Sequence, residues 1–271
     1  MANLLGVTAL TDYSELLGKV DAVSIVVPTS LHLGMARPFL DAGIHMLMEK
    51  PLAPSYEESL ALVEHAEKSG VVFQVGHLER FNGGVMALAE RIENPRFLEV
   101  TRIGPFVARA TDVDVVTDLM IHDIDIVMSL VNSPITSISA NGTPVITDHI
   151  DIANVRLEFE SGAVANVTAS RVSTKQQRRI RIFEQQHYYG LDYTNQQITM
   201  ATTEPPADGE QWPRIVTEEL DIETRLPLNT ELEAFIDTVQ NNGTPLVTGR
   251  IALEAVRVAH IIKEKMTACL A

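Results

Sequence analysis

The sequence predicts an α/β fold, in which an incomplete doubly wound parallel sheet is followed by an α/β domain with an open, mostly antiparallel sheet. In the first third of the chain, short apolar segments alternate with amphipathic segments of helical spacing. Such an order predicts right-handed crossovers and a parallel sheet covered on both faces. Beyond residue 96, apolar and polar residues alternate singly in segments bounded by Gly, Pro, Ser and Asn. That pattern is typical of antiparallel strands with one buried face.

The parallel part begins with an apolar run from Asp21 that ends at Pro28, as a buried strand entering a loop does. Before it, residues 4–17 are expected to form a short strand and then a helix. After it, Gly43 and Gly70 stand where helices should end. The elements so delimited are a helix at 31–42, a strand at 44–48, a helix at 55–69 begun by a Ser55–Glu58 capping box, and a strand at 71–75.

The antiparallel part contains alternating segments and ends in two helices. Three prolines between Thr202 and Trp212 predict a surface loop. Apolar residues at helical spacing predict the closing helices. The expected elements are strands at 97–103, 154–159 and 163–170, and helices at 229–240 and 250–267.

Composition excludes several classes of partner. The 271 residues carry a formal net charge of −15 with a pI near 4.9, whereas nucleic acids and anionic membranes demand a clustered basic surface. The single cysteine cannot form an internal disulfide or a metal cluster alone. No apolar run reaches about 18 residues, the length of a membrane span. We therefore expect a cytoplasmic protein that binds neither nucleic acid, membrane nor metal.

Glu49-Lys50-Pro51 follows a predicted parallel strand. Open α/β sheets bind their ligands at this carboxyl end of the strands. A lysine there can hold a substrate hydroxyl or exchange a proton with it. The alternative is a solvated surface lysine, which the position of Lys50 between an apolar strand and a proline disfavours.

Asp118 and His122 lie four residues apart, so on a helix they share one face. A carboxylate that orients an imidazole, which in turn reaches a hydroxyl, can transfer protons. Two alternatives stay open. The pair could bind a divalent ion, although no second His or Cys falls at ligand spacing, or the acidic residues could simply stabilise the first turn of a helix.

Two further polar motifs follow predicted parallel strands. Gly76-His77-Leu78-Glu79-Arg80-Phe81-Asn82 comes after the third strand, and polar residues on a loop at that edge are often functional. Pro28-Thr29-Ser30-Leu31-His32 comes after the first, where hydroxyls and a helix start can meet a ribose or phosphate. His32 could equally cap the helix on the surface.

Taken in order, these motifs resemble the signature of the Gfo/Idh/MocA oxidoreductase family. The resemblance runs from about Thr8 through the C-terminal helix, and the stretches 75–82 and 112–123 are most similar to the branch that acts on nucleotide sugars. It implies a Rossmann nicotinamide-binding domain and a second domain whose open sheet often mediates oligomers. The domains expected are 1–95, a partial dinucleotide-binding domain; 96–248, a substrate and oligomerisation domain; and 249–271, a C-terminal helix that packs back on the first.

The resemblance also implies residue roles. Lys50 would contact the reacting hydroxyl, His122 would transfer its proton and Asp118 would be the polar partner of His122. These three are expected to converge on one sugar-sized cleft. Pro28, Thr29, His32, Glu49 and Lys50 would line the nicotinamide side of the cofactor site, and His77, Arg80 and Asn82 are expected to contact substrate.

The implied reaction is NAD- or NADP-dependent oxidation of a secondary sugar hydroxyl, such as that at C3 of the nucleotide sugar UDP-N-acetylglucosamine. The family's Gly-x-Gly-x-x-Gly turn and its flanking elements, about 45 to 50 residues in a complete doubly wound half, have no counterpart in the sequence. We therefore expect weakened cofactor binding and, near residues 5–27, an exposed apolar edge that a homo-oligomer would cover. The alternative function is a catalytically impaired sugar-binding or regulatory module.

Overall fold

The computed structural model describes residues 2–108, 113–209 and 211–270. The chain divides into two compact units. The first comprises Met1–Gly76 and Glu233–Leu253, and the second comprises His77–Leu232 and Glu254–Ala271. The domain boundaries expected at residues 95 and 248 stay predictions.

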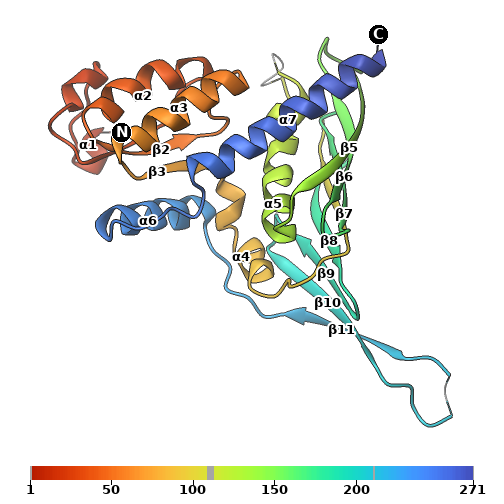
Figure 1. Cartoon of the computed structure of the whole chain (residues 1–271). Helices are drawn as coiled ribbons and strands as arrows, with labels where there is room; N and C mark the ends of the chain where they lie inside the picture. The colour runs from red at the N-terminus through yellow and green to blue at the C-terminus, as the bar shows by residue number, and fades with distance from the viewer. Residues whose placement is uncertain (1, 109–112, 210, 271) are drawn as a thin grey trace. The chain divides into compact units, whose positions relative to one another are not determined.

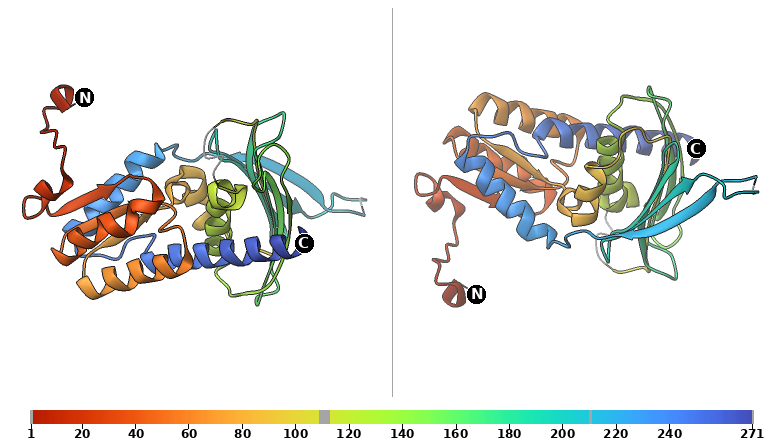
Figure 2. Two further views of the ribbon diagram at one scale, coloured as in Figure 1. Left: turned by 90° about the horizontal axis from the view of Figure 1, so that it is seen from above. Right: turned by 90° about the horizontal axis from the view of Figure 1, so that it is seen from below.

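The first unit is built on a three-stranded parallel sheet of order β1-β2-β3. Helices lie on both faces of this sheet, α2 and α3 on one and α6 on the other (Figures 1 and 2). This arrangement confirms the incomplete doubly wound fold. The elements are β1 (Ala22–Ile25), α2 (His32–Asp41), β2 (His45–Glu49), α3 (Tyr56–Ser69), β3 (Phe73–Gly76) and α6 (Pro227–Gln240).

Local signals place the ends of α3 where the sequence predicts them. The Ser55 hydroxyl accepts a hydrogen bond from the Glu58 backbone N–H at 3.1 Å, as in a capping box. Gly70 ends the helix at φ 66°, a left-handed conformation that glycine adopts without steric cost. The predicted capping box and helix end are confirmed.

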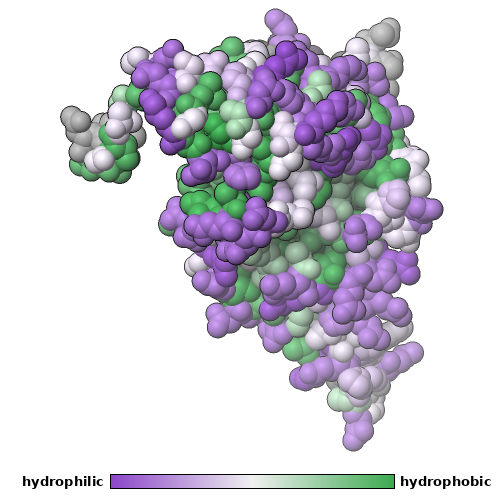
Figure 3. Space-filling view, turned by 60° about the vertical axis from the view of Figure 1, so that its left-hand side comes forward, coloured by the Kyte–Doolittle hydropathy of each residue, from purple (hydrophilic) through white to green (hydrophobic). Residues whose placement is uncertain are grey.

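The segment before β1 differs from its prediction. The short helix α1 (Ala2–Leu5) and the 3-10 turn η1 (Tyr13–Leu16) stand in this segment, so the expected strand is wrong and the expected helix is a single 3-10 turn. A strand requires a neighbour to pair with its backbone, and among the described strands β1 pairs only with β2. Leu4, Leu5 and Val7 are accordingly exposed. Figure 3 shows small hydrophobic areas among hydrophilic ones on the surface.

The second unit is built on an eight-stranded sheet of order β11-β10-β9-β8-β4-β7-β6-β5. β4 and β7 are parallel and the other pairs are antiparallel, which confirms the mostly antiparallel sheet. The strands are β4 (Phe97–Ile103), β5 (Ile135–Thr143), β6 (Ile152–Phe159), β7 (Val164–Ser170), β8 (Gln177–Phe183), β9 (His187–Asp192), β10 (Gln197–Glu204) and β11 (Arg214–Leu220). Because β10 continues to Glu204 against β11, the predicted loop begins three residues later than expected.

Helices cover one face of this sheet. The second-unit helices are α4 (Gly83–Ala89), α5 (Ile121–Val131) and the part of α7 (Gly249–Leu270) from Glu254 onward, and they lie on the same side (Figure 1). Val100, Val167 and Ile180 of the sheet join Ile124 of α5 and Ile262 of α7 in one buried core. Side chains of the opposite face, such as Asn154 and Arg179, are polar and exposed.

A buried carboxylate fixes the connection between β5 and β6. Asp151 Oδ2 accepts hydrogen bonds from the backbone N–H groups of Val145, Ile146 and Thr147 at 2.6 to 2.8 Å. Its Oδ1 accepts one from Arg171 Nε at 2.7 Å. Although burial raises the pKa of Asp151, these donors together hold it well below the ordinary value.

Candidate functional site

The carboxyl edge of the first sheet holds the motifs that follow β1 and β2. The 3-10 turn η2 (Thr29–Leu31) comes directly after Pro28, and Glu49 is the last residue of β2. Lys50 follows it, half-buried, and the Lys50–Pro51 peptide is cis. Thr29, Glu49 and Lys50 thus stand at neighbouring parallel strand ends, the edge at which such sheets bind ligands.

His32 connects the loops that follow these two strands. Its imidazole is fully buried, and its Nε2 lies 3.0 Å from the carbonyl oxygen of Val27. Its Nδ1 lies 3.2 Å from the carbonyl oxygen of Leu52. The alternative of a surface helix cap is therefore wrong, and the structure gives His32 a positioning role for both loops.

A side chain at Gly76 on β3 would crowd the end of β2. A Cβ added to Gly76 would lie 3.3 Å from the Cα, and equally close to the Oε2, of Glu49. Glu49 Oε2 in turn lies 3.3 Å from the backbone nitrogen of Lys50, from which it accepts a hydrogen bond. Gly76 therefore leaves room for the Glu49 carboxylate beside the lysine.

In the second unit, two residues of the His77–Asn82 motif surround a buried aspartate of α5. Arg80, on the 3-10 turn η3 (Leu78–Phe81), donates to Asp125 Oδ2 through Nε at 2.7 Å. His77 Nδ1 lies 3.7 Å from the same oxygen, and both His77 and Asp125 are buried. The aspartate thus fixes this turn against α5.

Asn82 is buried, and both the oxygen and the nitrogen of its side-chain amide form hydrogen bonds. Its Oδ1 accepts from the Gly84 N–H at 3.0 Å, which caps α4, and its Nδ2 donates to the Tyr193 carbonyl at 3.0 Å. These bonds show a structural role for Asn82. Contact of His77, Arg80 or Asn82 with a substrate stays a prediction.

Asp118 and His122 lie where the helix changes its winding. Asp118 belongs to a π-helical turn, η4 (Val116–Met120), and His122 lies in the first turn of α5. π-turns are rare and occur often at functional sites. Both side chains are half-buried, and the His122 ring lies 6.5 Å from the His77 ring, edge to face. The structure therefore brings together Asp118, His122 and His77 at one end of α5.

A buried ion-pair network joins β4, α5 and η3. The sequence-based prediction missed this network. Arg102 donates to both carboxylate oxygens of Asp123 at 2.8 Å and to Glu79 at 2.9 Å. Burial favours the neutral form of each partner and raises the pKa of Asp123, whereas Asp123 and Glu79 hold the pKa of Arg102 above its ordinary value. Because two oxygens that both accept from one guanidinium require an ionised carboxylate, the pair is charged.

One signal for this network was present in the sequence. Leu98, Val100 and Arg102 alternate along β4, so the arginine occupies a position that the pattern assigns to the core. Tyr193 joins the network, since its ring centroid lies 5.5 Å from the guanidinium carbon of Arg102. Burial and the charge of Asp123 raise the pKa of Tyr193 well above its ordinary value, which keeps the phenol neutral.

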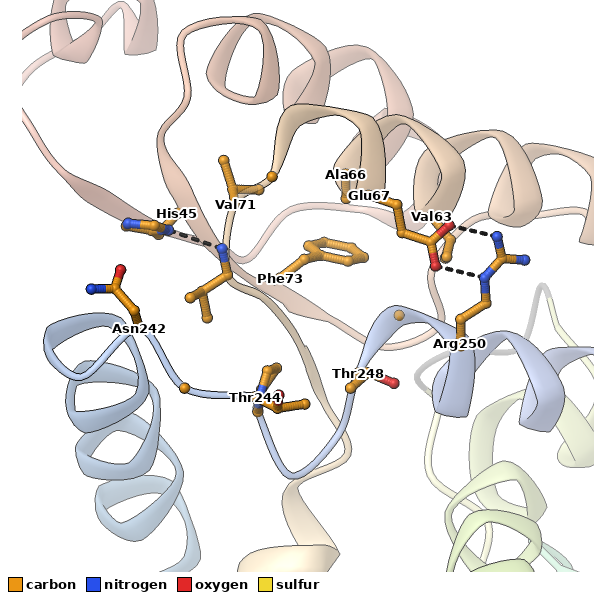
Figure 4. A pocket seen from close by; sticks show the side chains of 15 residues that line it. His45, Val63, Ala66, Glu67, Val71, Phe73, Asn242, Thr244, Thr248 and Arg250 are labelled. Carbon is orange, nitrogen blue, oxygen red and sulfur yellow. Dashed lines mark hydrogen bonds and ion pairs between the residues drawn. The ribbon is translucent and has the colours of Figure 1, made fainter.

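The first unit also contains a cavity of about 410 Å³ at the other edge of its sheet (Figure 4). His45, which begins β2, lies with Asn242 at one end of it, and the Glu67–Arg250 ion pair lies at the other end. This cavity lies at the amino ends of β2 and β3, away from Lys50. It therefore does not contribute to the predicted site.

No group of three or more His, Cys, Asp or Glu side chains in the described ranges is arranged to hold a metal ion. Among the helices of those same ranges, none combines the length and apolar character needed to cross a bilayer.

Comparison with known proteins identifies the family. Residues 1–77 match the "oxidoreductase family, NAD-binding Rossmann fold" and residues 91–187 the "GFO/IDH/MocA C-terminal domain". UDP-N-acetylglucosamine 3-dehydrogenase of Acidithiobacillus ferrooxidans is 36% identical over 85% of this chain and 74% of its own length. The NAD-dependent scyllo-inositol 2-dehydrogenase of Bacillus subtilis is 31% identical over 84% and 70%.

Solved structures agree with the sequence comparison. The crystal structure of the Acidithiobacillus ferrooxidans UDP-N-acetylglucosamine 3-dehydrogenase superposes with a TM-score of 0.91 at 32% identity. The superposition covers 100% of this chain and 86% of that one. A levoglucosan dehydrogenase with NADH and levoglucosan shares the fold, with a TM-score of 0.85 at 19% identity. The chain therefore belongs to the Gfo/Idh/MocA family of NAD(P)-dependent oxidoreductases, whose members include sugar dehydrogenases.

Proposed function

We propose that the protein oxidises a secondary hydroxyl of a nucleotide sugar, the C3 hydroxyl of UDP-N-acetylglucosamine, with NAD or NADP as the hydride acceptor. The observation that carries this proposal is the similarity to UDP-N-acetylglucosamine 3-dehydrogenase, which extends over the whole chain at a TM-score of 0.91. The proposal is also supported by residue chemistry, since hydroxyl oxidation requires groups that hold and move a proton. Lys50, Asp118 and His122 are such groups.

The residues after β1 and β2 fit the nicotinamide side of the cofactor. Thr29 offers a hydroxyl, Glu49 a carboxylate and Lys50 an ammonium group at adjacent carboxyl ends of parallel strands, and Pro28 and His32 hold their loops. This donor and acceptor set suits ribose hydroxyls and a carboxamide. A bound nicotinamide supplies the redox step by accepting the hydride.

The chain's own residues handle the hydroxyl. Lys50 donates a hydrogen bond to the reacting oxygen or receives its proton, and His122 is the second proton-transfer group. Asp118 lies four residues before His122 along the helix, from where its carboxylate orients the imidazole. Asp118 and His122 lie on the π-turn and on α5. A helical element defines the position of a side chain better than a loop does.

The direct test is an assay of NAD and NADP reduction by the purified 271-residue chain. UDP-N-acetylglucosamine, free N-acetylglucosamine and scyllo-inositol serve as substrates. We expect turnover of the nucleotide sugar above that of the other two. Faster oxidation of scyllo-inositol would instead indicate a polyol dehydrogenase.

Calorimetric titration distinguishes this enzyme from a binding module. If the protein is an enzyme, it binds the nucleotide sugar and also a cofactor, either NAD or NADP. Binding of the sugar in the absence of measurable cofactor binding would indicate a sugar-binding or regulatory protein and contradict the proposal.

We also propose that the protein forms a homo-oligomer through the open face of its eight-stranded sheet. Helices cover only one face of this sheet within the second unit (Figure 1). The other face presents polar side chains such as Asn154, Thr168 and Arg181, which can hydrogen-bond across an interface. Light scattering should give a mass above that of one chain, and a monodisperse monomer would contradict this assembly.

A further inference from the structure

A small cavity of about 190 Å³ lies beside the Asp118 turn in the second unit. Its walls come from the end of β4 and the loop after it, from η4, from the end of β7 and from the start of β8. The polar side chains that matter are those of Arg102, Asp118, Ser170, Arg171, Gln176 and Arg178. The cavity is smaller than the roughly 300 to 1,000 Å³ that holds a complete small-molecule ligand. It therefore suits one group of a larger ligand.

The three arginines of this cavity are not equivalent. Arg102 is bound by Asp123 and Glu79, and Arg171 donates to Asp151 at 2.7 Å. Arg178 makes no side-chain hydrogen bond or ion pair within the described part of the chain. It is nevertheless half-buried and lies on the core-facing side of β8, in step with Ile180 and Ile182.

Arg178 lies beside the Arg102 ion-pair network and makes no hydrogen bond to it among the described residues. Arg178 is the direct cross-strand partner of Arg102, and like charges in such positions repel. Asp123 attracts Arg178 at longer range, but both of its oxygens already accept from Arg102. The five N–H donors of Arg178 thus have no acceptor in the described fold, and a ligand anion would supply one.

The opposite charge within the cavity belongs to Asp118. A carboxylate accepts hydrogen bonds from sugar hydroxyls, and a guanidinium binds phosphate oxygens through two parallel N–H groups. A sugar that carries a phosphate on its anomeric oxygen presents both groups within one molecule. The exposed Gln176 amide adds a donor on the Arg178 side.

We propose that Arg178 binds a phosphate of the sugar substrate and thereby makes the protein select a sugar phosphate or nucleotide sugar over a free sugar. This inference rests on the proposed function, because it assumes that the sugar ring lies at Asp118. It adds a residue that determines specificity and that no motif in the sequence indicates.

Calorimetric titration of the full chain and of Arg178→Gln tests the inference with four probes. UDP-N-acetylglucosamine, UDP and N-acetylglucosamine 1-phosphate carry phosphate, and free N-acetylglucosamine, measured by saturation-transfer NMR, does not. We expect Arg178→Gln to weaken binding of the 1-phosphate and the nucleotide sugar about ten- to a hundredfold, as loss of a charged hydrogen bond does. Binding of the free sugar should be unchanged. Loss for UDP and the nucleotide sugar but not for the 1-phosphate would place the contact at the phosphate attached to uridine, and would still support selection of a nucleotide sugar by Arg178.

Arg179→Gln is the matched control, because Arg179 is the next residue on β8 and its exposed side chain donates to the Tyr188 hydroxyl on the other face. Arg179→Gln removes the same charge as Arg178→Gln and should leave the affinity for all four probes unchanged. Arg178→Lys keeps the charge but loses the two-pronged geometry, so it should give an intermediate loss, and it carries the test if Arg178→Gln does not fold.

Two results would overturn the inference alone. The wild-type chain could bind UDP-N-acetylglucosamine while Arg178→Gln binds it equally well, or Arg178→Gln could weaken the free sugar as much as the phosphorylated probes. A wild-type chain that binds scyllo-inositol and none of the four probes would overturn the proposed function as well.

Discussion

One arginine–carboxylate pair of the first unit is exposed, whereas one pair of the second unit is buried. In the first unit, Arg250 pairs with Glu67 through two hydrogen bonds, yet both side chains are about half exposed, at 51% and 49%. In the second unit, Arg102 and Asp123 make equally good bonds at 5% and 0% exposure. Good geometry is therefore common to both pairs, and burial decides what each contributes. The predicted proton-transfer residues also differ in their settings. Lys50 lies on a loop of the first unit, whereas Asp118 and His122 lie on a helix of the second.

The largest effect is expected from Lys50→Ala in the first unit. If Lys50 handles the proton, its loss should lower kcat/KM by about 10²- to 10⁴-fold without changing the unfolding midpoint, because the side chain is half-buried at a loop. Steady-state assays and urea unfolding measure the two quantities. Lys68→Ala, at an exposed position of α3, is the control. Activity within tenfold of the wild type would remove Lys50 from the mechanism.

Arg102→Met should have the largest effect on stability. Removing one partner leaves Asp123 buried and without its principal cation, which costs about 3 to 5 kcal/mol of unfolding free energy. Urea denaturation measures the loss. Arg181→Met removes an arginine of the neighbouring strand that pairs with Glu99 and is 40% exposed, so its loss should be small. Equal effects of the two variants would contradict the role assigned to burial.

Asp151→Asn should cost about 1 to 3 kcal/mol at neutral pH, because an amide replaces a charged acceptor of three backbone N–H groups and Arg171. The folded-state pKa of Asp151 lies below its unfolded value. The stabilisation is therefore complete above about pH 4 and is lost as the pH falls further. Urea unfolding at several pH values should show the wild type approaching Asp151→Asn in acid. A difference that stays constant would contradict this assignment.

Arg250→Gln should have the smallest effect. Water solvates both partners of an exposed pair, so the attraction gained is offset by lost solvation and side-chain freedom. We expect no measurable shift of the unfolding midpoint at physiological salt. A shift comparable with that of Arg102→Met would show that geometry, and not burial, sets the strength of these pairs.

Periodicity predicted the strands of the first unit, β4, β6, β7 and the helices α2, α3, α6 and α7, because strand and helix spacing report which side chains face a core. It did not predict β5, β8 to β11 or α4. The elements from β1 to β3 and the strand β4 lie within a few residues of their expected positions. The segment before β1 failed because strand formation depends on a pairing partner that local sequence does not reveal.

For the candidate site, the sequence predicted that Lys50 follows a strand and that Asp118 and His122 lie on a helix, and the structure has them in such elements, while their roles stay predictions. It missed Arg102, Asp123 and Arg178, because their importance depends on register between strands that are distant in the chain. The π-turn around Asp118 was missed for a similar reason, since its winding follows from packing. The expectation that Lys50 and His122 share one cleft stays a prediction.

The double contact of His32 has a mechanical consequence. One imidazole lies between carbonyl oxygens at Val27 and at Leu52, so this buried side chain contacts the segments after both β1 and β2. The backbone near Lys50 is therefore held in place relative to the loop that carries Thr29. Preorganisation of this lysine is in this way built into the unliganded protein and does not have to be supplied by the arriving ligand.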